Sequence, residues 1–126
     1  MGLVYANIIL SNPVRPELKA IEVRCLVDTG STFLVIPQHL AAQLQINELE
    51  TREATLADGT NHTVPYGGPV KISFENRSCF VGTLIMGNEV LLGAVPIEDM
   101  DLVVLPKLLK LTVNPESPNI ARGHVK

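Results

Sequence analysis

The sequence predicts an all-β domain with one or two short helices. Of its 126 residues, 46% are hydrophobic and only 4% are aromatic, so the core must be built from Val, Ile and Leu, which favour strands. Short segments that are apolar, or that alternate between apolar and polar residues, recur along the chain and are separated by Pro, Gly and Asn. Only 18% of the residues are charged and the length suits one domain, so we expect a folded chain with a modest aliphatic core.

The first half of the chain predicts a long hairpin and a short helix. Residues 3–10 and 20–27 are apolar and favour strands, and the segment between them contains two prolines and an asparagine, which indicate a loop. This hairpin ends at Asp28. Residues 37–44 begin with Pro and then carry apolar residues at helical spacing, so they predict a helix.

The middle of the chain predicts a second hairpin and two further strands. Residues 51–66 alternate weakly around Asp58-Gly59, a dipeptide typical of tight hairpin turns. The sequence Pro-Tyr-Gly-Gly-Pro at 65–69 is expected to interrupt the strand pattern. Residues 70–74 then alternate cleanly, and 79–86 predict a long apolar strand.

The C-terminal part predicts a helical turn, a last pair of strands and a tail. Residues 97–101 contain three acids, which we expect to face solvent rather than hold a metal, because no His or second carboxylate cluster completes a ligand shell. Residues 102–105 and 108–113 predict strands on either side of a turn. No apolar periodicity follows, so we expect one domain over residues 1–113 and a flexible tail over 114–126.

The strongest candidate for a functional site is Asp28-Thr29-Gly30-Ser31. Apolar segments at 26–27 and 33–36 flank it, so the carboxylate lies at the end of a buried strand. An unpaired charge in such a place costs on the order of several kcal/mol unless its protonation changes. The same four residues are also ordinary turn formers, so a plain turn is the alternative interpretation.

Two downstream features join this motif in resembling a known family. Val90-Leu91-Leu92-Gly93 is similar to the second signature of aspartic proteases, an apolar strand that ends in Gly and precedes a short helix. Residues 78–87 resemble the strand before that signature in retroviral proteases. The order and spacing over residues 4–113 are similar to those of a retropepsin-like domain, and the whole chain is most similar in character to small bacterial and archaeal single-domain members. The resemblance implies a closed β-barrel with a flap hairpin.

By this resemblance, Asp28 is the catalytic residue of an aspartic endopeptidase that acts on peptide or protein substrates. Thr29 would link two loops across a dimer axis, and Gly30 would let their backbones approach. Ser31 would donate a hydrogen bond to the carboxylate, which favours its ionised form and lowers the working pH.

The resemblance also assigns a role to the predicted hairpin at 51–66. It falls where retroviral proteases carry the flap that closes over bound peptide, so Ala57, Asp58, Gly59 and Thr60 are the candidate flap and substrate-binding residues. The Gly-rich tip of retroviral flaps is absent, and a plain surface hairpin is the alternative.

Peptide-bond hydrolysis by this class uses two carboxylates that share one proton, so one carboxylate is not enough. The chain contains a single Asp-Thr-Gly, and a working site therefore requires two copies of Asp28 on the axis of a homodimer. Two other classes of function stay open. One is a catalytically silent retropepsin-fold dimer that binds extended peptides, and the other is a plain structural β domain, which would leave the strand ending at Gly93 unexplained.

Charge and hydropathy argue against other partners. The net charge is −3 and the ten basic residues are scattered singly, so we expect no nucleic-acid partner. No apolar run approaches the roughly 20 residues of a membrane span and no basic segment precedes a long apolar one, so we expect no membrane partner and a cytoplasmic location. Cys25 and Cys79 lack a ligand partner at metal-binding spacing, so we expect reduced core cysteines, no metal site and no cofactor.

Overall fold

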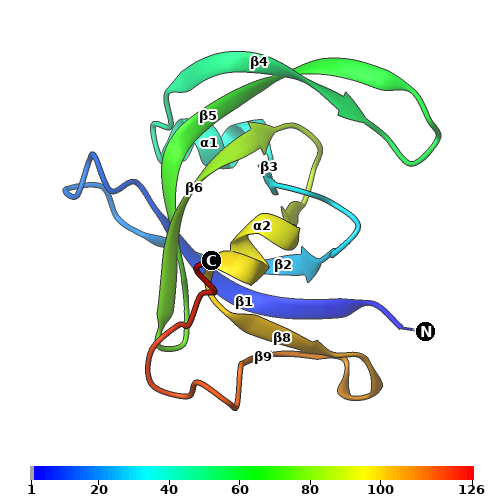
Figure 1. Ribbon diagram of the computed structural model, residues 1–126. Helices are drawn as coiled ribbons and strands as arrows, with labels where there is room; N and C mark the ends of the chain where they lie inside the picture. The colour runs from blue at the N-terminus through cyan, green and yellow to red at the C-terminus, as the bar shows by residue number, and fades with distance from the viewer. Residues whose placement is uncertain (1) are drawn as a thin grey trace.

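The computed structural model describes residues 2–126, which form nine strands, two α-helices and one short 3₁₀ helix (Figure 1). In chain order the elements are β1 (Val4–Ser11), β2 (Ile21–Val27), β3 (Leu34–Ile36), α1 (Gln38–Gln43), β4 (Glu48–Thr55), β5 (Asn61–Phe74), β6 (Arg77–Ile85), β7 (Val90–Leu92), α2 (Ala94–Asp99), β8 (Leu102–Leu105), η1 (Pro106–Leu108) and β9 (Lys110–Val113). These bounds confirm the predicted all-β class with short helices.

Six of the strands close into a barrel. They are paired in the order β1-β2-β7-β3-β6-β5, and β1 also pairs with β5, where Leu10 lies opposite Ile72. Two of the pairings, β2 with β7 and β3 with β6, are parallel, and the others are antiparallel. Closure leaves these six strands without a free edge inside the barrel wall, so the aliphatic core is enclosed on all sides.

The barrel interior is filled by alternate residues of its strands. In β1, Val4, Ile8 and Leu10 are buried, while Asn7 and Ile9 face outward. This period of two is what a strand with one apolar face requires. The largest fully buried hydrophobic side chains are almost all aliphatic: Ile8, Leu10, Leu34, Ile36, Leu44, Ile72, Leu92 and Met100.

The expectation that residues 65–69 interrupt the strand pattern was wrong. Strand β5 runs through them without a break, and its pairing with β6 shifts register between Gly67 and Val70. Pro69 is exposed and lies inside this shift, where no ladder hydrogen bond needs its missing N–H. The prolines and glycines therefore mark a bulge within one long strand rather than a loop.

The first half of β5 pairs with β4 in a hairpin that leaves the barrel and arches over one side of it (Figure 1). Its turn spans 56–60, where the Leu56 N–H donates to the Thr60 carbonyl at 2.8 Å and the Asp58 carboxylate accepts from the Thr60 N–H at 2.9 Å. Gly59 has φ of +85°, a conformation that favours glycine. The predicted hairpin is confirmed and begins three residues earlier than expected, at Glu48.

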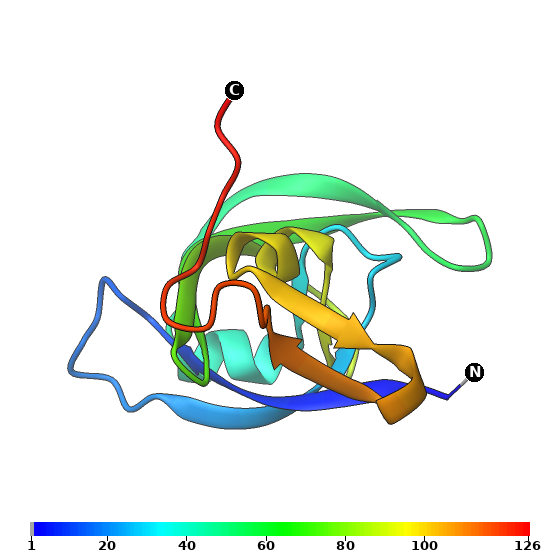
Figure 2. The same ribbon diagram turned by 60° about the horizontal axis from the view of Figure 1, so that its bottom comes forward.

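Helix α2 and the β8–β9 hairpin follow the barrel, and the chain then crosses back over it. The C-terminal residues lead away from the body on the side away from the N-terminus (Figure 2). Hydrogen bonds connect residues 114–122, which follow β9, to the rest of the protein. Asp101 accepts from the Ser117 hydroxyl and the Arg122 N–H, and Arg77 donates to the Ser117 carbonyl. Arg77 is buried, and its guanidinium also donates to the Met100 carbonyl at 3.0 Å.

The sequence did not predict these contacts after residue 113. A buried guanidinium needs acceptors, and the backbone carbonyl of Ser117 supplies one of them. The hydrogen bonds from Ser117, Arg122 and Asn114 hold the pKa of Asp101 below its ordinary 3.8, at about 2, with a smaller contribution from Arg77. The division of the chain into a domain and a tail stays a prediction.

None of the helices among the described residues is long and apolar enough to cross a membrane.

Candidate active site

Asp28 stands where β2 leaves its parallel partner β7. The last residues of the two strands, Val27 and Leu92, lie side by side, and the Asp28 N–H still donates to the Leu92 carbonyl at 2.9 Å. This bond makes Asp28 the first residue of the loop and the last one fixed by the sheet. Asp28 is therefore found at a strand end, as predicted, and the structure shows that it is half-buried there.

Both oxygens of the Asp28 carboxylate accept hydrogen bonds from its own loop. The Gly30 N–H donates to Oδ1 at 3.0 Å, and the Ser31 hydroxyl donates to Oδ2 at 2.9 Å. The Ser31 N–H also donates to the Asp28 backbone carbonyl at 3.1 Å, which tightens the turn. The expected contact between Ser31 and the carboxylate is present, and the two bonds fix the plane of the carboxylate.

Gly93 and the start of α2 support this loop from behind. A Cβ atom on Gly93 would lie 2.3 Å from the Phe33 carbonyl oxygen and 2.8 Å from that of Ser31, so only glycine fits. The first free N–H groups of α2 then donate to the loop, from Ala94 to the Ser31 carbonyl at 2.8 Å and from Val95 to the Thr32 carbonyl at 2.9 Å. The two sequence signatures thus form one packed unit.

A groove of about 780 Å³ opens beside Asp28. It lies between the loop at 30–33, the end of β4 with its turn at 53–57, and the turn at 86–89 that joins β6 to β7. Val35, Leu84 and Leu91 provide its apolar side. A groove of this size, with an apolar wall and a few polar groups, suits a bound peptide segment.

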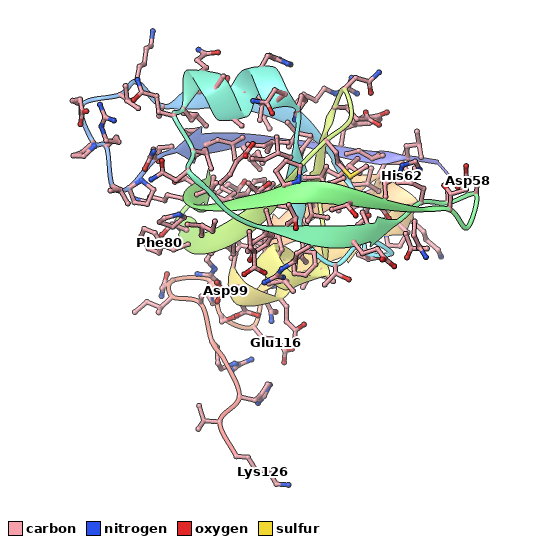
Figure 3. All side chains as sticks on the ribbon, turned by 90° about the horizontal axis from the view of Figure 1, so that it is seen from above. Asp58, His62, Phe80, Asp99, Glu116 and Lys126 are labelled. Atoms are coloured by element: carbon pink, nitrogen blue, oxygen red, sulfur yellow. The ribbon has the colours of Figure 1, made fainter. Side chains whose placement is uncertain are left out.

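The structure brings together only part of the predicted site. Ala57 lines the groove with Asp28, Gly30 and Ser31. Asp58, Gly59 and Thr60 are exposed beyond it, and Figure 3 places Asp58 at the far tip of the β4–β5 hairpin. Thr29 is exposed on the Asp28 loop. That these residues form a flap and a dimer link stays a prediction.

The sequence did not predict a contact between aromatic side chains of the Asp28 loop and of the β4–β5 hairpin. The rings of Phe33 and Tyr66 meet edge to face, with centroids 5.8 Å apart, and the Arg52 guanidinium lies 3.7 Å from the Tyr66 ring centre. Arg52 also donates to Glu50 at 2.9 Å. A cation over an aromatic face adds about 0.5–1 kcal/mol at such a site. Nothing in the spacing of these residues signals the contact, because it depends on how the hairpin folds over the loop.

The buried cysteines do not take part in the site. Both Cys25 and Cys79 are free thiols in the barrel core, and burial raises the pKa of Cys25 to about 11 and that of Cys79 to about 12. A thiol with so high a pKa is not a nucleophile near neutral pH. Within residues 2–126, no three or more His, Cys, Asp or Glu side chains are grouped so that they could hold a metal ion.

A closed barrel with an Asp-Thr-Gly-Ser loop, supported by a strand that ends in Gly and a short helix, defines a retropepsin-like fold. The structure of EIAV protease complexed with the inhibitor HBY-793 is similar, with a TM-score of 0.60 and 16% sequence identity over 82% of this chain and 93% of that one. The sequence model of the family described as aspartyl protease matches residues 17–120. No match is found among curated protein sequences. The chain belongs to the aspartyl protease family.

Proposed function

We propose that the protein is an aspartic endopeptidase whose active form is a homodimer, in which Asp28 from each of two subunits forms the catalytic pair. The observation that carries this proposal is the Asp28 carboxylate, which is oriented by Gly30 and Ser31 at the edge of a peptide-sized groove. Membership of the aspartyl protease family supports the reaction class.

The chemistry requires both copies of Asp28. One ionised carboxylate accepts a proton from water while the water oxygen attacks the scissile carbonyl carbon, and the protonated carboxyl of the partner subunit's Asp28 donates its proton to the carbonyl oxygen. The resulting tetrahedral intermediate then returns that proton. As the C–N bond breaks, the leaving nitrogen takes up the proton removed from water. Over the whole cycle each carboxyl group gains one proton and loses one, so the pair ends as it began, with one shared proton.

One side of the molecule offers a surface for the second subunit. The N-terminal end of β1, the turn between β8 and β9, the end of β2 and the tip of the β4–β5 hairpin all project to the same side (Figures 1 and 2). Leu3, Leu108 and Leu109 gather on this side, with 62%, 69% and 47% of their surface exposed. Large leucine side chains so exposed favour burial in a subunit interface. A partner on this side would bring its own Asp28 loop toward this one.

A silent dimer that binds extended peptides is the second candidate. Strand β4 pairs with β5 on one edge, and residues at its end line the groove, so its other backbone edge can pair with an added strand. The same edge would serve a protease substrate. The two candidates therefore differ in hydrolysis and not in binding.

The test is hydrolysis of a denatured protein and of peptides between pH 3 and pH 8 by the native chain and by Asp28→Asn. We expect cleavage by the native chain and none by the variant, which keeps the shape of the side chain and removes its ionisation. Unfolding curves for both proteins control for loss of structure. Residual cleavage by pure Asp28→Asn would contradict the proposal, and peptide binding without cleavage by the native chain would favour the silent dimer.

A further inference from the structure

The charges that line the groove indicate which peptides it accepts. Besides Asp28, the groove is lined by two carboxylates, from Glu53 on β4 and Glu89 in the turn before β7. Both glutamates are exposed, and neither forms an ion pair with any residue of the described chain. They lie on two different walls, one on the hairpin arm and one on the opposite turn.

No Lys, Arg or His of residues 2–126 lines the groove to balance these charges. The nearest base in sequence, Arg52, is already engaged, because it donates to Glu50 at 2.9 Å and stacks on Tyr66 at 3.7 Å. Its partner Glu50 lies outside the groove lining. The negative charge in the groove is therefore uncompensated, and apolar walls concentrate the field of such charges.

The apolar part of the groove sets a second requirement. Val35 and Leu84 belong to a buried cluster with Ala54, and all three reach the groove surface. Leu91 packs against the same cluster. An apolar side chain of a bound peptide would cover this wall, while its flanking side chains would meet Glu53 or Glu89.

We propose that the groove selects extended peptides that carry Lys or Arg at positions flanking an apolar residue, and that Glu53 and Glu89 determine this preference. The inference rests on the proposed function, because it assumes that peptides bind in this groove. It adds which side chains those peptides carry. Complementary charges at an exposed rim act mainly through selectivity and association rate, and they weaken with salt. A peptide with Glu at the same positions is repelled by two walls.

The experiment measures binding and cleavage separately with one set of labelled peptides. The peptides share an apolar centre and differ only in having Lys, Gln or Glu at each flanking position. Binding to Asp28→Asn is measured by fluorescence anisotropy, because this variant does not cut the probe and lacks the charge of Asp28. Cleavage by the protein with Asp28 intact gives kcat/KM for the same peptides.

Glu53→Gln and Glu89→Gln are the test variants, and Glu48→Gln is the matched control, since Glu48 is an exposed acid on the same strand as Glu53 and does not line the groove. We expect Lys peptides to bind more tightly than Gln peptides, and each test variant to reduce the Lys preference by about twofold to fivefold, as for exposed charge pairs. Glu48→Gln should leave the preference unchanged, and added salt should reduce it.

The two proposals fail in different ways. Equal binding of Lys, Gln and Glu peptides, or a Lys preference that survives in both Glu53→Gln and Glu89→Gln, would overturn the inference even if the protein is an active protease. A Lys preference in the Asp28→Asn binding assay that the two variants reduce would support the inference even if the protein cleaves nothing. Because both glutamates are exposed, neither substitution is expected to affect folding.

Discussion

Replacing Gly93 by Ala tests how the Asp28 loop is held. The backbone of Gly93 has φ of −89° and ψ of −175°, which any residue adopts, so the new methyl group acts only by occupying space. It would lie 2.3 Å from the Phe33 carbonyl oxygen, whereas ordinary contact begins at 3.4 Å. The loop or the strand must therefore move by about 1 Å in a closely packed region.

Two effects of Gly93→Ala lower the free energy of unfolding. Forcing an extra methyl group into packed structure costs about 1–3 kcal/mol. Movement of the loop also weakens the hydrogen bonds from Ala94 to Ser31 and from Val95 to Thr32, which contribute about 1 kcal/mol each. We expect the free energy of unfolding to fall by about 3–5 kcal/mol. For a chain of this length the fall in Tm is about 12 °C or more.

Thermal and urea unfolding followed by circular dichroism measure this change, with two glycine controls. Gly123→Ala has open space around it and should change nothing. Gly87→Ala also has open space, but its φ of +74° adds strain of about 1–2 kcal/mol. If Gly93→Ala were no less stable than Gly87→Ala, close packing of the two signatures would not be what positions Asp28.

Three further predictions concern the loop, the hairpin and the C-terminal segment. Ser31→Ala removes one of the two hydrogen bonds that orient the Asp28 carboxylate, so kcat/KM should fall by about tenfold or more; an unchanged kcat/KM would refute this. Gly59→Val strains a turn with φ of +85° at the hairpin tip. It should lower kcat clearly while changing Tm little; unaltered kinetics would make the hairpin a plain surface feature. Asp101 has a pKa that is lowered to about 2 from its ordinary 3.8. Its contribution to stability is therefore complete at pH values above 3.8 and is lost as the pH falls toward 2. Asp101→Asn should therefore be less stable than the native protein at pH 6, with the difference shrinking below pH 4, and a difference that is constant with pH would contradict this assignment.

Local sequence patterns predicted the elements that depend on neighbouring residues. Apolar residues that favour strands predicted β1 and β2, Pro37 preceded helix α1 as expected, and Asp58-Gly59 formed the turn of a hairpin. The placement of Asp28 at a strand end followed from the apolar residues around it. Each of these features is decided by interactions within a few positions along the chain.

Features that depend on distant residues were not predictable in this way. Pro69 indicated a break, yet a register shift against β6 accommodates it inside β5. The segment after residue 113 lacks apolar periodicity, so the hydrogen bonds that Ser117 makes with Arg77 and Asp101 had no signal in the sequence. The Arg52 contact with Tyr66 likewise needs the hairpin to be folded over the loop. In each case the partner lies far away in sequence or the pairing register is set by another strand.

The most direct test of the paired Asp28 mechanism is a mixing experiment. A fixed amount of native protein is equilibrated with increasing Asp28→Asn at concentrations where sedimentation shows that the dimer is saturated, and peptide cleavage is measured. Random exchange of subunits places half of the native chains in mixed dimers at an equal ratio, so activity should fall to about half and continue to fall with more variant. Activity that stays proportional to the native protein alone, at every ratio, would show that one subunit carries a complete site and would contradict the mechanism.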